Sequence, residues 1–126
     1  MESNKFDQMI TFIYVSDLNT SKKFYEDIMG FSLRLDQGTC RIVEVNQKGG
    51  GLLGYCVRDQ KSIPGDDLII TLITSSVDDW YDYLAGCDVN IPELPKLNRK
   101  YKIYHFFFTD PDGYKLEIQE FRDPAW

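Results

Sequence analysis

The segment from Tyr104 to Phe121 constrains the fold of this chain more than any other. Two runs rich in β-branched and aromatic residues flank Asp110-Pro111-Asp112-Gly113, in which each residue type favours a tight turn. A type I turn followed by a left-handed residue pairs the residues on either side of the loop and fixes the register of both strands. The segment therefore predicts a β-hairpin.

The register of this hairpin predicts two different faces, because successive side chains of a strand point to opposite sides. One face is apolar and predicts a core. Its residues are Phe106, Phe108, Tyr114, Leu116 and Ile118. On the other face, Phe107 pairs with Glu117, and His105, the single histidine of the chain, pairs with Gln119. We therefore expect His105 and Glu117 to be neighbours.

Composition restricts the class of protein. A chain of 126 residues with 43% hydrophobic residues predicts one domain with a substantial core. The net charge of −6 argues against a nucleic-acid partner or an anionic membrane. The polar start, Met1 to Lys5, is not typical of a signal peptide, and no apolar run is long enough to span a membrane. Cys40, Cys56 and Cys87 lack a CxxC spacing, so we expect reduced thiols in the cytoplasm.

The chain predicts the same order of elements twice: a strand, a helix, then three strands. The first repeat, about residues 9–58, has expected strands at 9–15, 31–35, 40–45 and 52–57, and a helix at about 19–29. A linker is expected at about 59–67. The second repeat, about residues 68–122, has an expected strand at 68–74, a helix at about 77–85, a strand at 89–91, a loop at 92–102 and the hairpin. Neither repeat buries a sheet face alone, so pairing of the repeats or of two chains is expected.

Two motifs resemble a known family. Val15-Ser16-Asp17-Leu18 with Phe24-Tyr25 and Gly30, followed by Asp110 to Glu117, is similar to the vicinal oxygen chelate superfamily. That superfamily includes glyoxalase I, bleomycin- and fosfomycin-resistance proteins and extradiol dioxygenases. The resemblance implies an α+β fold in which two βαβββ modules form a curved mixed sheet around a cleft. It also implies a homodimer.

The resemblance also implies four positions for the ligands of a divalent metal, usually His, Gln or Glu. These positions fall on Ile10, near Leu53-Gly54, on Ile69 and on Glu117. Isoleucine has no donor atom, so this sequence predicts a degenerate metal site and no cofactor. A different metal site that uses Glu117 and His105 is the weaker alternative.

A ligand cleft is expected to be lined by Ile10, Phe12, Tyr14, Cys56, His105, Phe107 and Glu117. In this interpretation His105 and Glu117 supply the polar contacts, and aromatic rings supply stacking area. These residues also have purely structural interpretations. His105 can be a strand histidine bonded to the backbone, Glu117 an ordinary strand glutamate and Cys56 a buried core cysteine. The face with Ile10, Phe12 and Tyr14 can pack against the partner module.

Three functions remain open. The first is metal-free binding of a small, partly apolar or aromatic molecule, as in bleomycin-resistance proteins. The second is a metal-dependent lyase, isomerase or dioxygenase that uses Glu117 and His105. The third is an association protein whose cleft is filled. No nucleophilic triad is supported, and no catalytic residue is assigned.

Overall fold

The computed structural model of the protein describes residues 6–60 and 64–126. The chain divides into two compact units, Met1–Ser62 and Ile63–Trp126, called module one and module two below. Residues 1–5, the polar start, and 61–63, part of the expected linker, lie outside the described residues. In the part that is described, no helix is long and apolar enough to cross a membrane.

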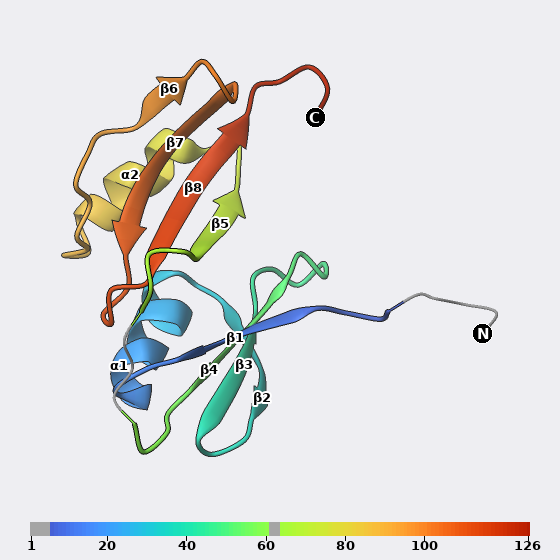
Figure 1. The fold of residues 1–126 in the computed structure, drawn as a ribbon, viewed down its shortest axis with the longest axis vertical. Coiled ribbons are helices and arrows are strands. Elements are labelled where there is room, and N and C mark those ends of the chain that lie inside the picture. Colours follow the sequence, from blue (N-terminus) through green and yellow to red (C-terminus); the bar gives the residue numbers. More distant parts are fainter. Residues whose placement is uncertain (1–5, 61–63) are drawn as a thin grey trace. The chain divides into compact units, whose positions relative to one another are not determined.

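Module one is a four-stranded mixed sheet with a helix against one face (Figure 1). Its elements are β1 (Ile10–Tyr14), α1 (Leu18–Lys22), the π-helix η1 (Lys23–Ile28), β2 (Ser32–Asp36), β3 (Cys40–Glu44) and β4 (Leu52–Cys56). The strand order is β1-β4-β3-β2, in which β1 runs parallel to β4 and the other pairs are antiparallel.

Module two repeats this topology. Its elements are β5 (Ile69–Ile73), α2 (Val77–Ala85), β6 (Lys96–Asn98), β7 (Ile103–Thr109) and β8 (Lys115–Phe121). The order is β5-β8-β7-β6, again with one parallel pair, β5 with β8. The predicted α+β class with two βαβββ units is therefore confirmed.

The β7–β8 hairpin forms in the predicted register. Thr109 pairs with Lys115, Phe107 with Glu117, and His105 with Gln119. In the turn, the amide of Gly113 donates to the carbonyl of Asp110 at 3.0 Å, and Gly113 adopts a φ of 98°. Because this φ is disfavoured for residues with a Cβ, glycine determines where the turn can form.

The strand expected at Val89–Ile91 is wrong. The second strand of module two is β6, Lys96–Asn98, within the stretch expected to be a loop. The β6–β7 turn determines this position. In that turn the amide of Tyr101 donates to Oδ1 of Asn98 at 3.1 Å, and Lys102 has a φ of 54°. Pairing with β7 therefore outweighs the local strand propensity of the earlier segment.

The helix of module one begins as expected but changes its winding. Oδ1 of Asp17 accepts the amides of Asn19 and Thr20 at 2.9 and 3.3 Å, which caps α1. The second half is the π-helix η1, in which Tyr25 turns its ring onto that of Tyr55 at 5.5 Å. The sequence pattern predicted the helix but not the wider turns.

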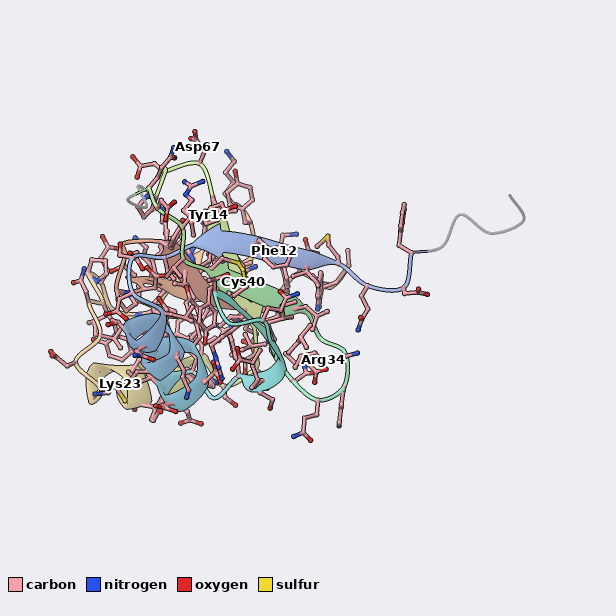
Figure 2. The ribbon with its side chains drawn as sticks, turned by 90° about the horizontal axis from the view of Figure 1, so that it is seen from below. Phe12, Tyr14, Lys23, Arg34, Cys40 and Asp67 are labelled. Carbon is pink, nitrogen blue, oxygen red and sulfur yellow. A yellow bond between two sulfur atoms is a disulfide. The ribbon has the colours of Figure 1, made fainter. Side chains whose placement is uncertain are left out.

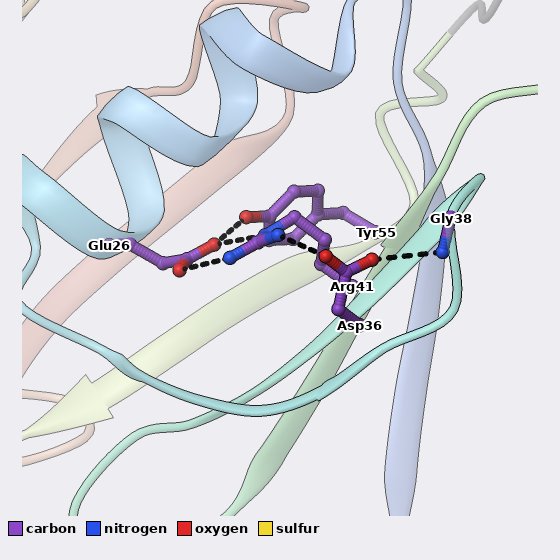
Figure 3. Close-up of polar contacts among 5 residues, drawn as sticks. All are labelled: Glu26, Asp36, Gly38, Arg41 and Tyr55. Atoms are coloured by element: carbon purple, nitrogen blue, oxygen red, sulfur yellow. Dashed lines mark hydrogen bonds and ion pairs between the residues drawn. The ribbon is translucent and has the colours of Figure 1, made fainter.

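A nearly buried ion pair joins this helix to the sheet (Figure 3). Nε and Nη2 of Arg41 on β3 donate to the two carboxylate oxygens of Glu26 at 2.7 and 2.8 Å. The hydroxyl of Tyr55 on β4 donates to Glu26 as well, and Nη1 of Arg41 donates to Asp36 at 3.1 Å. The side chains of Arg41 and Glu26 are only 10% and 11% exposed, so the bidentate pair is largely desolvated.

Burial alone would raise the pKa of Glu26, but the hydrogen bonds from Arg41 and Tyr55 and the charge of Arg41 lower it below its ordinary value of 4.5. A carboxyl whose pKa is lower in the folded state stabilises the protein above its unfolded pKa. That contribution is lost as the pH falls through the folded pKa.

Glu26→Gln is expected to lower the free energy of unfolding at pH 7 by roughly 2 to 3 kcal/mol, because it leaves the guanidinium of Arg41 poorly paired. The difference from the unsubstituted protein should be constant from pH 7 to about pH 5 and should shrink below the unfolded value of 4.5. Urea unfolding at pH 7, 5, 4 and 3 measures it. Asp27→Asn, which changes an exposed carboxylate on the same helix, is the control. A difference that stays constant down to pH 3 would show that Glu26 is not stabilised as its contacts indicate.

Candidate functional site

The face of the module-two sheet that points away from α2 carries a cluster of polar side chains from three strands. The opposite face carries Phe106, Phe108, Leu116 and Ile118, all buried, as the hairpin register predicted. Tyr114, the fifth residue expected in this core, is only half-buried. The polar face carries His105 and Phe107 on β7, Glu117 and Gln119 on β8, and Thr71 on β5. Three strands therefore place their polar side chains on one surface.

His105, Glu117 and Thr71 form a hydrogen-bonded chain across β7, β8 and β5. Nδ1 of His105 lies 2.6 Å from Oε2 of Glu117, and the hydroxyl of Thr71 donates to Oε1 of Glu117 at 2.9 Å. His105 is 5% exposed and Glu117 is 7% exposed. In such a desolvated setting these bonds hold the carboxylate and the imidazole in one orientation.

The second nitrogen of His105, Nε2, is buried and finds no hydrogen-bond partner within the described part of the chain. When Glu117 is ionised it can only accept, so Nδ1 of His105 carries the proton that it shares with Glu117. Nε2 is then an acceptor in the neutral imidazole and a donor in the imidazolium. A buried polar atom without a partner costs about 1 to 3 kcal/mol, so this nitrogen is suited to contact a bound molecule.

Two hollows in module two border His105. The larger, about 490 Å³, combines apolar and aromatic walls with a few polar groups, as ligand sites usually do. Its walls include Ile69, Tyr101, His105, Phe107, Glu117, Gln119 and Phe121. The smaller, about 320 Å³, is lined by Pro92, Leu94 and Lys115 together with Lys96, His105 and Phe107, of which the last three also line the larger hollow.

The expected ligand residues of module one share the corresponding face of their own sheet. Ile10, Phe12 and Tyr14 are 36%, 53% and 42% exposed, whereas the alternate residues Ile13 and Val15 are buried. Figure 2 shows Phe12 and Tyr14 along β1. The expected alternation along β1, with Ile13 and Val15 on the core side, is therefore confirmed, and a ligand on the opposite face stays a prediction.

Cys56 corrects one expectation. It forms a disulfide with Cys40, the residue directly opposite on β3 (yellow bond in Figure 2), so the expectation of reduced thiols is wrong for these two residues. Cys87 is a free thiol. Sequence spacing did not reveal the bond, because it depends on the register of β3 against β4. The correction also removes one argument for a cytoplasmic location.

The registers of the two modules show which positions are equivalent. Phe12 pairs with Gly54 in the parallel pair of module one, and Thr71 pairs with Glu117 in that of module two. Gly54 therefore stands where module two has Glu117. By the same comparison, Cys40 and Cys56 stand at the positions of His105 and Gln119.

The four positions that the superfamily uses for a metal do not fit one in this chain. Ile10 and Ile69 have no donor atom. A Cβ on Gly54 would lie 2.3 Å from the ring of Phe12, so that ring fills the space of the missing side chain. Both oxygens of Glu117 already accept hydrogen bonds. Among the described residues, no cluster of three or more His, Cys, Asp or Glu side chains could hold a metal ion.

Sequence reasoning missed two members of this site. Thr71 lies between Ile69 and Ile73 on the same face of β5, and the equivalence of the repeats would have placed it beside Glu117. Lys96 was assigned to a loop, so its pairing with His105 was not foreseen.

Curated relatives are bacterial. The chain is 32% identical over 111 residues to the metallothiol transferase FosB of Staphylococcus epidermidis, covering 82% of this chain and 74% of the relative. It is 30% identical over 111 residues to the FosB of Lysinibacillus sphaericus, with the same coverage of both chains.

Solved structures share the fold. A member of the glyoxalase/bleomycin resistance protein/dioxygenase superfamily from Sphaerobacter thermophilus superposes with a TM-score of 0.78 at 21% identity, covering 92% of this chain and 98% of that one. The fosfomycin resistance protein FosX from Listeria monocytogenes superposes with a TM-score of 0.72 at 14% identity, covering 92% and 93%. The sequence pattern that defines the Glyoxalase/Bleomycin resistance protein/Dioxygenase superfamily matches residues 5–118, and the chain belongs to this superfamily.

Proposed function

We propose that this protein binds a small, partly aromatic organic molecule in the larger hollow of module two, without a metal ion. The observation that carries the proposal is the buried Nε2 of His105, which lacks a partner while Glu117 holds the other nitrogen of the ring. A ligand that reaches Nε2 recovers the free energy that this nitrogen loses by burial.

The walls of the larger hollow indicate the character of the ligand. Phe107, Tyr101 and Phe121 line it with aromatic rings, of which Phe121 already stacks on Trp126 and Phe107 carries Lys115 over its ring. Gln119 offers an amide with both a donor and an acceptor. A flat ring that bears one polar substituent suits this combination. The sequence resemblance implies the same kind of role, metal-free binding of a small molecule as in bleomycin resistance proteins, which the superfamily name includes.

A metal-dependent enzyme is the second candidate. It is favoured by the relatives named metallothiol transferase, which are about 30% identical to this chain. Within this chain the polar groups of such an enzyme would be His105 and Glu117, the alternative expected from the sequence. The donor set described above argues against it.

We also propose that the protein is a cytoplasmic homodimer. The resemblance to the superfamily, whose members commonly form homodimers, supports the dimer. Light scattering coupled to size-exclusion chromatography measures the oligomeric state directly.

Two substitutions of His105 distinguish the role of its Nδ1, which bonds Glu117, from the role of its Nε2. The first, His105→Asn, keeps an N–H near the position of Nδ1 and deletes Nε2, whereas His105→Gln keeps an amide near the position of Nε2 and loses the bond to Glu117. For ligands found in a thermal-shift screen with chelator present, His105→Asn is expected to weaken binding by about tenfold or more, the loss of one buried hydrogen bond. His105→Gln should weaken binding less. Isothermal titration calorimetry measures both.

Equal affinity in the unsubstituted protein, His105→Asn and Glu117→Gln would place the ligand outside the larger hollow and reject the proposal. A screen without any binder would favour the association protein.

Divalent metals are expected to leave the melting temperature within about 1 °C of its value in chelator, because a group that does not bind the native state does not stabilise it. Zn²⁺, Mn²⁺ and Ni²⁺ are tested by differential scanning calorimetry without added thiol. Elemental analysis of the purified protein provides a second measurement. A rise of several degrees that Glu117→Gln abolishes would support the metal-dependent enzyme instead.

A further inference from the structure

The Cys40–Cys56 disulfide joins two residues whose backbones are already held together by the sheet. Their Cα atoms lie 4.1 Å apart as a directly opposed pair of β3 and β4. The amide of Val57 donates to the carbonyl of Thr39 at 2.9 Å just beyond the disulfide, and β1 flanks β4 on its other side. Because the strands are paired independently of the sulfur atoms, two reduced thiols would remain opposite each other.

The two cysteine residues differ in exposure. Cys56 is 6% exposed, whereas Cys40 is half-buried, so an incoming reagent meets Cys40 first. The pair lies on the sheet face away from the helix, the face that also carries Phe12 and Tyr14 (Figure 2). Access on this face determines which sulfur is attacked and which one leaves.

A positive charge lies over the ring of Tyr14, the β1 neighbour of Cys56. Tyr14 is the residue of β1 that pairs with Cys56, and the guanidinium carbon of Arg58 lies 3.8 Å from the centre of the Tyr14 ring. A neighbouring cation favours thiolate over thiol. Both the attacking sulfur and the leaving sulfur of an exchange reaction carry negative charge, so a cation on the neighbouring strand residue acts in favour of exchange.

We propose that Cys40 is a site of reversible S-thiolation by a low-molecular-weight thiol. The thiolate of that molecule attacks Sγ of Cys40 and forms a mixed disulfide. The Cys40–Cys56 bond breaks, and its electron pair leaves on Sγ of Cys56, which takes up a proton. A second thiolate attacks the small-molecule sulfur of the mixed disulfide and releases Cys40 as a thiolate. In total, two small thiols are oxidised to their disulfide and the protein pair is reduced by two electrons.

The adduct would occupy the ligand face of module one. Cys40 and Cys56 stand at the positions that His105 and Gln119 hold in module two, where both side chains wall the larger hollow. The inference does not depend on the ligand proposed for that hollow. It assigns thiol–disulfide exchange to module one, in which Gly54 stands where module two has Glu117.

The test uses the full chain with Cys87→Ser, so that only the pair reacts. Native protein is incubated with increasing glutathione, quenched with acid and measured by intact-mass and peptide mass spectrometry. We expect a single glutathione adduct on Cys40 and then a protein with two free thiols. The far-UV circular dichroism spectrum should stay unchanged throughout.

Matched single-cysteine variants test the order of attack. In the Cys87→Ser background, Cys56→Ser leaves Cys40 as the sole thiol, and Cys40→Ser leaves Cys56. With glutathione disulfide, the chain that retains Cys40 should form its adduct about tenfold faster or more, since the rate follows access and thiolate character.

Three results would overturn the proposal: a pair that glutathione reduces only after denaturant is added, equal rates in the two single-cysteine chains, or loss of the folded spectrum on reduction. The first and third are measured on the chain that retains both cysteines of the pair, so they do not depend on whether either single-cysteine chain folds.

Discussion

The parallel pairing of the first strand of each module with its last strand determines which candidate functional residues of these strands face each other. The connection that returns the chain beside β1 or β5 leaves one helix on one face of the sheet and leaves the other face for side chains of alternate residues. In module two this pairing sets Thr71 opposite Glu117. A slip of one residue would move Glu117 to the helix side, where Phe106 and Phe108 form the core. The register that buries the core therefore also places Glu117 in the site.

Local chemistry made most of this module predictable. The Asp110–Gly113 turn determines the register of β7 and β8, and register with alternation then places His105 beside Glu117. What could not be predicted depends on distant segments. The β6 strand depends on a turn that contains a left-handed Lys102, and the Cys40–Cys56 bond depends on how β3 aligns with β4. Burial of His105, which leaves Nε2 without a partner, results from packing in three dimensions and has no signature in the sequence pattern.

The name of the relatives implies a metal-dependent enzyme, whereas the residues at the site of this chain argue against a bound metal. About 30% identity over four fifths of the chain establishes the family and the fold, and the relatives carry a name that implies a metal. Superfamily folds host different functions on one scaffold, so function has to be argued from the side chains at the site. Here two of the four positions are isoleucines and a third is a glycine covered by Phe12. A chain that shares the fold of these relatives but has different residues at the metal positions is consistent with both the identity and the site.

Module one supplies an internal comparison for module two. The two sheets have the same topology and register, so Gly54 with Phe12 shows that this fold accepts an apolar arrangement where module two has Glu117 with Thr71. Replacing a buried ion pair by well-packed apolar residues of similar volume is often neutral or stabilising, and here one nitrogen of the pair is unsatisfied as well. Since the scaffold does not require polar groups at these positions, stability does not explain His105 and Glu117. Their presence is explained if a bound molecule completes the hydrogen bonds that the protein leaves unmade.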